Sequence, residues 1–382
     1  MIDRDRLSET FMALVKIDSV SREEARVSGM IQEIMADLGA DIVIDNAGEK
    51  VNGDTGNLIA RLKGNTEVPP LILNAHMDTV EPGRGIVPEL NDGVFTSVGN
   101  TILGADDKSA IAIILEALHI IRENSLACGP LEVVFTVCEE IGLMGVKHLD
   151  FNHISAEYGF ALDATDTRGV VTRAPSANRL EFSVHGKEAH AGAAPEKGIN
   201  AIKIASRAIA DLELGRIDEE TTCNIGVIQG GLATNIIPNL VKVRGEVRSH
   251  NAEKLESVTQ TIVSAFDRAA AESTKIFDGD ELPKVDSHVE HDFTRTHIAE
   301  DHPVVTLAAK AARNLGREMV CKTTGGGADA NIFFQQGIIT GVLGTGMQNM
   351  HTINESVRLD DMVEAVELLL EILRLHARGE VS

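Results

Sequence analysis

Hydrophobic and polar residues follow two different patterns of spacing along this chain. Short, nearly continuous apolar runs occur at 71–73, 131–137 and 160–162, and such runs are typical of strands that are buried on both faces of a sheet. Longer stretches, such as 3–17 and 110–121, repeat their apolar residues at the spacing of one helix face. This mixture of buried strands and amphipathic helices predicts an α/β fold.

The two ends of the chain carry this α/β pattern. Its predicted helices span 3–17, 22–38, 110–121, 302–315, 329–336 and 360–376. Its predicted strands span 42–45, 58–62, 71–80, 131–137, 160–162 and 338–343. The polar stretch 47–56 and the stretch 81–99, which is rich in Gly, Pro and Asp, are predicted to be loops.

From about Pro175 the pattern changes to strands and helices in the order β-α-β-β-α-β, which is the order of a ferredoxin-like sandwich. The predicted strands are 179–185, 223–229, 240–249 and 282–291, and the predicted helices are 199–214 and 252–272. We therefore expect three segments: the first part of a catalytic domain over 1–175, an inserted domain over 176–292, and the second part of the catalytic domain over 293–382.

Acidic residues and a histidine stand where the buried strands end. His76 and Asp78 lie at the end of one strand, Glu139 and Glu140 follow a second, and Asp163 follows a third. In an open α/β sheet, ligands bind beyond the carboxyl ends of the strands. His-x-Asp alone is common by chance, but the convergence of these residues favours a metal site, since a carboxylate beside a metal-binding imidazole fixes its tautomer.

Asp106 and Asp107 stand where the helix 110–121 begins. One interpretation is structural, because acidic residues suit the free N–H groups of a helix N-terminus. The other is functional, with a carboxylate held on a tight loop against a metal.

Taken in order, the motifs resemble those of a known family. They are His76-x-Asp78, Gly104-Ala-Asp106-Asp107-Lys108, Glu139-Glu140, Leu162-Asp163 and His351. Together they resemble the di-zinc metallopeptidase superfamily of aminoacylases and carboxypeptidases, and specifically its peptidase T-like branch. The resemblance implies a zinc-exopeptidase-like catalytic domain, a three-layer αβα structure with a mixed sheet, carrying an inserted ferredoxin-like lid and dimerisation domain.

The resemblance also implies a role for each residue of the metal site. His76 and Asp163 would hold one zinc ion, Glu140 and His351 would hold the other, and Asp106 would bridge both. Asp78 would support His76, and Glu139 would be the general base. Imidazole and carboxylate ligands suit two Zn²⁺ ions, although Co²⁺ or Mn²⁺ could replace them.

The inserted domain carries further candidates on the same resemblance. His190, in GKEAHAGAAPEKG, would stabilise the oxyanion, often in the partner subunit's site, and Arg248 would bind a substrate carboxylate. Gly326 and Gly327 precede a helix and could cradle a carboxylate, and Asn235 is a weaker candidate. The structural alternatives are a surface-loop histidine for His190, a solvated sheet face for Arg248 and a flexible turn for the glycines.

The expected function is that of a metal-dependent exopeptidase acting on short peptides. The Gly-rich stretch GGGADANIF differs from that of the true tripeptidases of the branch, so tripeptide aminopeptidase activity stays open. Two alternatives use the same metal centre: a deacylase or amidohydrolase of N-acyl amino acids, and a carboxypeptidase. A third is a metal-binding protein without catalysis, which the presence of Glu139 disfavours.

Composition narrows the expected partners and location. There are 58 acidic and 35 basic side chains, a formal charge of −23, no Trp and one Tyr, so neither nucleic acid nor an anionic membrane surface is an expected partner. The N-terminal segment has no apolar signal region and the four cysteines form no C-x-x-C pair, which favours the cytoplasm. By the resemblance, we expect a homodimer formed through the inserted domain.

Overall fold

The structure is a computed structural model that describes residues 2–273, 275–277 and 280–380. Its contacts divide the chain into two compact units. One unit takes the described residues of Met1–Arg173, Thr296–Thr324 and Ala328–Ser382, and the other takes those of Ala174–Arg295 and Gly325–Gly327. These limits fall close to the 176–292 segment expected from the sequence.

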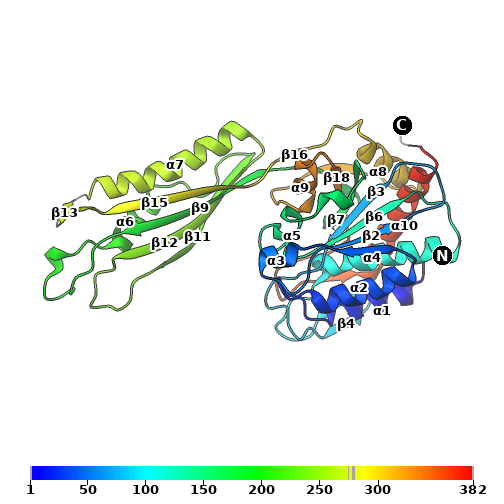
Figure 1. Ribbon diagram of the computed structural model, residues 1–382, viewed down its shortest axis with the longest axis horizontal. Coiled ribbons are helices and arrows are strands. Elements are labelled where there is room, and N and C mark those ends of the chain that lie inside the picture. The colour runs from blue at the N-terminus through cyan, green and yellow to red at the C-terminus, as the bar shows by residue number, and fades with distance from the viewer. Residues whose placement is uncertain (1, 274, 278–279, 381–382) are drawn as a thin grey trace. The chain divides into compact units, whose positions relative to one another are not determined.

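A mixed nine-stranded sheet forms the centre of the first unit (Figure 1). The nine strands are β1 (Asp41–Ile44), β2 (Leu58–Leu62), β3 (Leu71–His76), β6 (Leu131–Thr136), β7 (Tyr158–Ala164), β8 (Gly169–Ala174), β16 (Thr296–His297), β17 (Val320–Thr323) and β18 (Ile339–Gly344). Their order is β1-β2-β6-β3-β7-β18-β8-β16, with β17 paired to β8. The central strands β6, β3, β7 and β18 run parallel, so their carboxyl ends meet at one edge of the sheet.

Helices cover both faces of this sheet. They are α1 (Arg4–Val15), α2 (Ala25–Asp37), α3 (Ala47–Val51), α4 (Ala105–Glu123), α5 (Met144–Lys147), η1 (Phe151–His153), α8 (Pro303–Asn314), α9 (Asp329–Gln335) and α10 (Leu359–Ala377). Along β7, Phe160 and Leu162 belong to the large core that also contains α4 and α10, whereas Ala161 between them packs against Ala330 of α9. Successive strand residues point to opposite faces, so the layers are αβα and the predicted α/β class is confirmed.

The prediction of a loop over 81–99 is wrong in part. It contains a hairpin of β4 (Pro88–Asn91) and β5 (Val94–Ser97), which pairs with β19 (Val357–Arg358). Asp92 and Gly93 between the strands both have positive φ, as the tight turns of hairpins require. Phe95 is buried against Phe11, with the ring centroids 4.9 Å apart, so the hairpin is anchored to the core. The predicted loop 47–56 likewise contains the short helix α3.

The second unit is built on an antiparallel sheet of order β10-β11-β12-β9-β15. Its elements are β9 (Ser176–His185), η2 (Pro195–Lys197), α6 (Ala201–Ala210), β10 (Gly215–Arg216), β11 (Thr221–Gly230), β12 (Leu240–Ser249), α7 (Ala252–Ala271), β13 (Lys275–Phe277), β14 (Asp280–Leu282) and β15 (Lys284–Phe293). The two helices pack against one face through a core that includes Phe182 and Phe266, whose rings stack with centroids 4.0 Å apart. The element order is the predicted β-α-β-β-α-β, with short extra strands.

In the part of the chain that the structure describes, no helix combines the length and the apolar character needed to cross a bilayer.

Candidate metal centre

The parallel strands of the first unit bring the predicted ligands to one edge of the sheet. His76 is the last residue of β3, Glu139 and Glu140 follow β6, and Asp163 lies near the end of β7. Asp106 comes from the start of α4, which packs against β3 and β7. The loop after β18 supplies His351.

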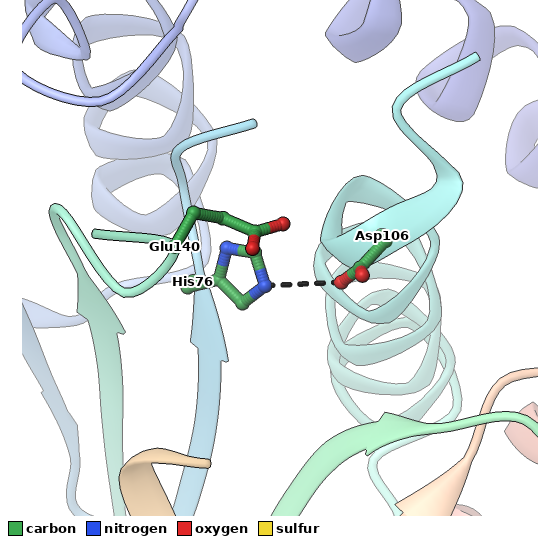
Figure 2. A group of neighbouring side chains, drawn as sticks. All are labelled: His76, Asp106 and Glu140. Carbon is green, nitrogen blue, oxygen red and sulfur yellow. Dashed lines mark hydrogen bonds and ion pairs between the residues drawn. The ribbon is translucent and has the colours of Figure 1, made fainter. Parts of the chain in front are cut away.

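The ring of His76 is held at both nitrogens. Its Nδ1 lies 2.9 Å from the carbonyl oxygen of Asp78 and 3.4 Å from that residue's Oδ1. A carbonyl oxygen can only accept a hydrogen bond, so Nδ1 carries the proton and Nε2 of the neutral ring has the free lone pair. That Nε2 points at Asp106 Oδ1, 3.1 Å away (Figure 2).

Asp78 does more than the sequence predicts, because its buried carboxylate also fixes the pair of glutamates. Oδ1 accepts the backbone N–H of Glu139 at 2.9 Å, and Oδ2 accepts that of Glu140 at 3.2 Å. The hydroxyl of Ser21 donates to Oδ2 at 2.6 Å. One carboxylate therefore positions a candidate histidine ligand and the backbone of both glutamates.

Asp106 lies between the two histidines. Its Oδ1 contacts His76 Nε2, and its Oδ2 lies 3.2 Å from His351 Nε2. The same nitrogen of His351 is 2.9 Å from Glu140 Oε1. The peptide bond between Asp106 and Asp107 is cis. An aspartate whose two oxygens face different histidines has the geometry expected of a bridging ligand.

Among the described residues, two overlapping groups of side chains have ligand atoms within 4.8 Å of one another. One is His76, Asp106 and Glu140, and the other is Asp106, Asp107 and Asp163. Asp106 belongs to both groups, while the assignment of His76 with Asp163 and of Glu140 with His351 to separate metals stays a prediction. Asp107, the neighbour of Asp106, accepts the backbone N–H of His76 through Oδ2 at 3.1 Å.

The charges of this cluster fit divalent cations. Burial, with the charge of Asp106, raises the pKa of the Asp163 carboxyl well above its usual range, and burial likewise raises the pKa of Glu139. Burial opposes ionisation of Asp106 as well, but its close contacts with His351 and His76 leave its pKa low. Divalent cations would offset the repulsion among these carboxylates, and nitrogen and oxygen donors are ligands that zinc accepts.

Glu139 and Glu140 are adjacent in sequence but differ in their contacts. Glu140 reaches His351, whereas the carboxylate of Glu139 is buried and makes no hydrogen bond or ion pair with the described residues. A carboxylate that is held in place through its backbone and stays free at its oxygens suits proton transfer.

The candidates of the second unit form two local groups. His190 and Asn235 are exposed and lie on adjacent segments, since the N–H of Ala191 donates to the Asn235 carbonyl at 2.9 Å. The Nδ1 atom of His190 accepts the N–H groups of Gly192 at 3.2 Å and Ala193 at 3.1 Å. Because Nδ1 is an acceptor there, Nε2 of the neutral ring carries the hydrogen and is available as a donor.

Arg248 and the Gly-rich loop form the other group. The guanidinium contacts Glu246 at 2.9 Å and the carbonyl oxygen of Gly325 at 3.4 Å, and lies 6.0 Å from the centroid of the Phe293 ring. A Cβ atom on Gly327 would stand 2.4 Å from that ring, so only glycine fits there.

The chain is similar in sequence and fold to known proteins. The family model for peptidase family M20/M25/M40 matches residues 72–375, and the chain belongs to this family. An uncharacterized protein of Bacillus subtilis, YqjE, is 39% identical over 379 residues, which cover 99% of this chain and 100% of that protein.

Two solved structures are similar over nearly their whole length. Aminopeptidase PepT from Bacillus cereus has 38% identity and a TM-score of 0.85, covering 98% of this chain and 99% of that one. A tripeptidase from Staphylococcus aureus has 36% identity and a TM-score of 0.90, covering 99% and 100%. The predicted resemblance to the peptidase T-like branch is confirmed, and the chain is a metal-dependent hydrolase of peptide bonds.

Proposed function

We propose that this protein is an exopeptidase that hydrolyses short peptides with two divalent metal ions, Zn²⁺ or its substitutes Co²⁺ and Mn²⁺, held by His76, Asp106, Glu140, Asp163 and His351. The observation that carries the proposal is the position of Asp106 between two histidines, beside a Glu139 carboxylate without a partner among the described residues. The names of the similar PepT and tripeptidase structures support short peptides as substrates.

When bound, the metals would lower the pKa of a water molecule and polarise the scissile carbonyl. Glu139 accepts a proton from the attacking water and then donates it to the amine that leaves. Asp78 keeps Glu139 in place through its backbone N–H. Asp78 also sets the tautomer of His76, so that Nε2 is directed to the ligand cluster.

The second unit would supply the groups that recognise the substrate. His190 offers an N–H donor to the oxyanion, which agrees with its Nδ1 acting as an acceptor of two backbone N–H groups. Arg248, with Gly326 and Gly327, would bind a carboxylate of the peptide, and Asn235 would assist beside His190.

We also propose that the protein is a cytoplasmic homodimer formed through the second unit. Strand β11 lies next to the short edge strand β10, which pairs with it only at Thr222 and Cys223 in the described structure. The rest of this side of β11 could pair with another chain. Ile228 of β11 is 50% exposed, and the nearby Leu232 is 83% exposed, as expected of residues that an interface would cover.

The test is a panel of dipeptides, tripeptides and N-acyl amino acids, assayed with added zinc, cobalt or manganese, in parallel with the Glu139→Gln variant as a control for contaminating peptidases. Release of one terminal amino acid from short peptides is the expected result, and its identity shows which end is attacked. Cleavage of N-acyl amino acids alone would replace the proposal by the deacylase alternative. No cleavage of any compound with any metal would overturn it.

A further inference from the structure

Glu355 is a buried acid that none of the roles above uses. It lies on the loop 348–356, whose base is closed by two backbone hydrogen bonds between Gln348 and Ser356, of 2.8 and 3.1 Å. His351 lies on the same loop with 53% of its side chain exposed, whereas Glu355 is 1% exposed. The loop therefore presents one candidate ligand and sends a carboxylate into the protein four residues later.

The carboxylate of Glu355 accepts three backbone N–H groups from the segment that carries Asp106. Oε2 accepts those of Leu103 and Gly104, both at 2.8 Å, and Oε1 accepts that of Asp106 itself at 2.9 Å. All three distances are those of strong hydrogen bonds to a charged acceptor.

These N–H groups need an external partner because of the way α4 begins. Gly104, at the N-cap, has φ 76° and no side chain with which to cap the helix, and Asp106 and Asp107 both depart from helical φ and ψ. The first N–H groups of a helix have no partner within it. Glu355 supplies that partner from 249 to 252 residues away in the sequence.

We propose that Glu355 is a positioning residue, which fixes the backbone of Asp106 and the loop of His351 as one rigid piece and thereby sets the affinity of the metal centre. This inference rests on the proposed function. Asp106 Oδ2 and His351 Nε2 are 3.2 Å apart, and each belongs to a segment that Glu355 joins to the other. Two metal ligands must be held within about 0.5 Å of their productive geometry. Without the hydrogen bonds of Glu355, the Asp106 segment and the His351 loop are no longer held together, and the two ligands move apart.

The Glu355→Gln variant weakens the hydrogen bonds between Glu355 and the Asp106 segment with little change in the shape of the side chain. An amide has a single acceptor oxygen, and its NH₂ group would face at least one N–H donor of the Asp106 segment. Residues that form hydrogen bonds to metal ligands typically contribute about 10–100-fold to metal affinity. We expect Glu355→Gln to lower the metal affinity by a factor in that range. Glu355→Asp keeps the charge but is one methylene shorter, and it should weaken binding in the same direction.

Glu132 provides a matched control. It is also a buried acid of the first unit, 5% exposed, and it accepts the N–H groups of Ser155 and Ala156 at distances from 2.8 to 3.1 Å. It lies at the start of β6, at the opposite end of that strand from Glu139 and Glu140. Glu132→Gln should lower the melting temperature without changing the metal affinity.

The experiment titrates zinc into the metal-free full-length proteins in competition with a chromophoric chelator, and records melting curves of the metal-free forms. The expected result is a metal affinity about 10–100-fold lower for Glu355→Gln and wild-type affinity for Glu132→Gln. If Glu355→Gln melts earlier but binds zinc as wild type does, Glu355 is merely structural and the inference is overturned.

Two further outcomes are also decisive. If Glu355→Gln does not fold, Glu355→Asp is judged by the same affinity criterion. If the wild-type protein binds no zinc, cobalt or manganese, both the proposed metal centre and this inference are overturned. Normal wild-type binding with unchanged variants would instead overturn the inference alone.

Discussion

In the unit built on the nine-stranded sheet, most of the candidate metal centre is buried, including His76, Asp106 and Glu139, although the His351 side chain is 53% exposed. Asp78, which is fully buried, contacts His76 and accepts hydrogen bonds from Ser21 and the N–H groups of Glu139 and Glu140. In the other unit, His190 and Asn235 are exposed and Arg248 is half-buried. The two sets can therefore be tested separately, because the proposed metal ligands all lie in the first unit and the residues proposed to recognise the substrate lie in the second.

Asp106→Ala should have the largest effect, because one carboxylate serves both metals. We expect bound metal to fall at both sites and turnover to fall to background. Elemental analysis of the dialysed protein measures the first effect and peptide hydrolysis the second. Asp163→Ala is the control, since it should reduce only one of the two sites. Two tightly bound zinc ions in Asp106→Ala would reject the bridging role.

Glu139→Gln should separate proton transfer from metal binding. Removing the base should lower turnover by about 10²–10⁴-fold or more, while the metal content stays at the wild-type level because Glu139 is not among the proposed ligands. The neighbouring variant Glu140→Gln should instead weaken metal binding, since Glu140 contacts His351. Near-normal turnover in Glu139→Gln would mean that another group moves the proton.

The His190→Ala variant tests whether this exposed histidine contributes to catalysis. With two bound metals retained, kcat should fall by about 10²–10³-fold, as for the loss of one oxyanion donor. His288→Ala, which removes an exposed histidine of β15 in the same unit, should leave kcat unchanged. Loss of metal from His190→Ala would contradict the proposal that the metal ligands all lie in the first unit.

Mixing the inactive variants His190→Ala and Glu139→Gln, under conditions that let subunits exchange, tests the proposed dimer. If His190 acts in the partner's site, a mixed dimer contains one site with an intact Glu139 and an intact His190, and activity recovers. No recovery despite demonstrated exchange would place His190 in its own subunit's site or outside catalysis.

Glu24→Gln should have the smallest effect, and only on stability. Burial, with the charge of Asp78, raises the pKa of Glu24 to about 7 from its usual 4.5, although the N–H and thiol of Cys138 donate to it. The folded state therefore holds a proton that the unfolded state releases, so this stabilisation is complete below pH 4.5 and is lost as the pH rises through about 7.

Melting curves of the metal-free protein measure this effect. Glu24→Gln cannot ionise, so its melting temperature relative to wild type should rise between about pH 4.5 and pH 7 and then level off. A constant difference across that range would show that Glu24 keeps an ordinary pKa in the folded protein.

Much of the first unit could be predicted because its signals are local. The apolar runs before His76 and Glu139 locate two central parallel strands, and parallel strands bring their carboxyl ends together. The hairpin 88–97 was missed although Asp92-Gly93 is a hairpin turn signal, because the Gly, Pro and Asp content of its surroundings favours a loop. The roles of Asp78 toward the glutamates and of Glu355 toward Asp106 depend on contacts between segments 61 to 252 residues apart. Such contacts leave no periodic trace in one sequence.

The first unit is also discontinuous in the chain, and this affects how the protein is made. Strand β18 pairs with β7 in the middle of the sheet, and α10 packs against α4 and α8, yet both lie after the second unit in the sequence. The second unit is nearly continuous in sequence and can fold while synthesis goes on, as domains generally do. A nascent chain without residue 351 lacks a candidate ligand, and one without α10 leaves the helices α4 and α8 without one of their packing partners. The candidate site is thus complete only after both parts of the first unit and residue 351 have been synthesised, so nascent chains that stop before that residue would lack its activity.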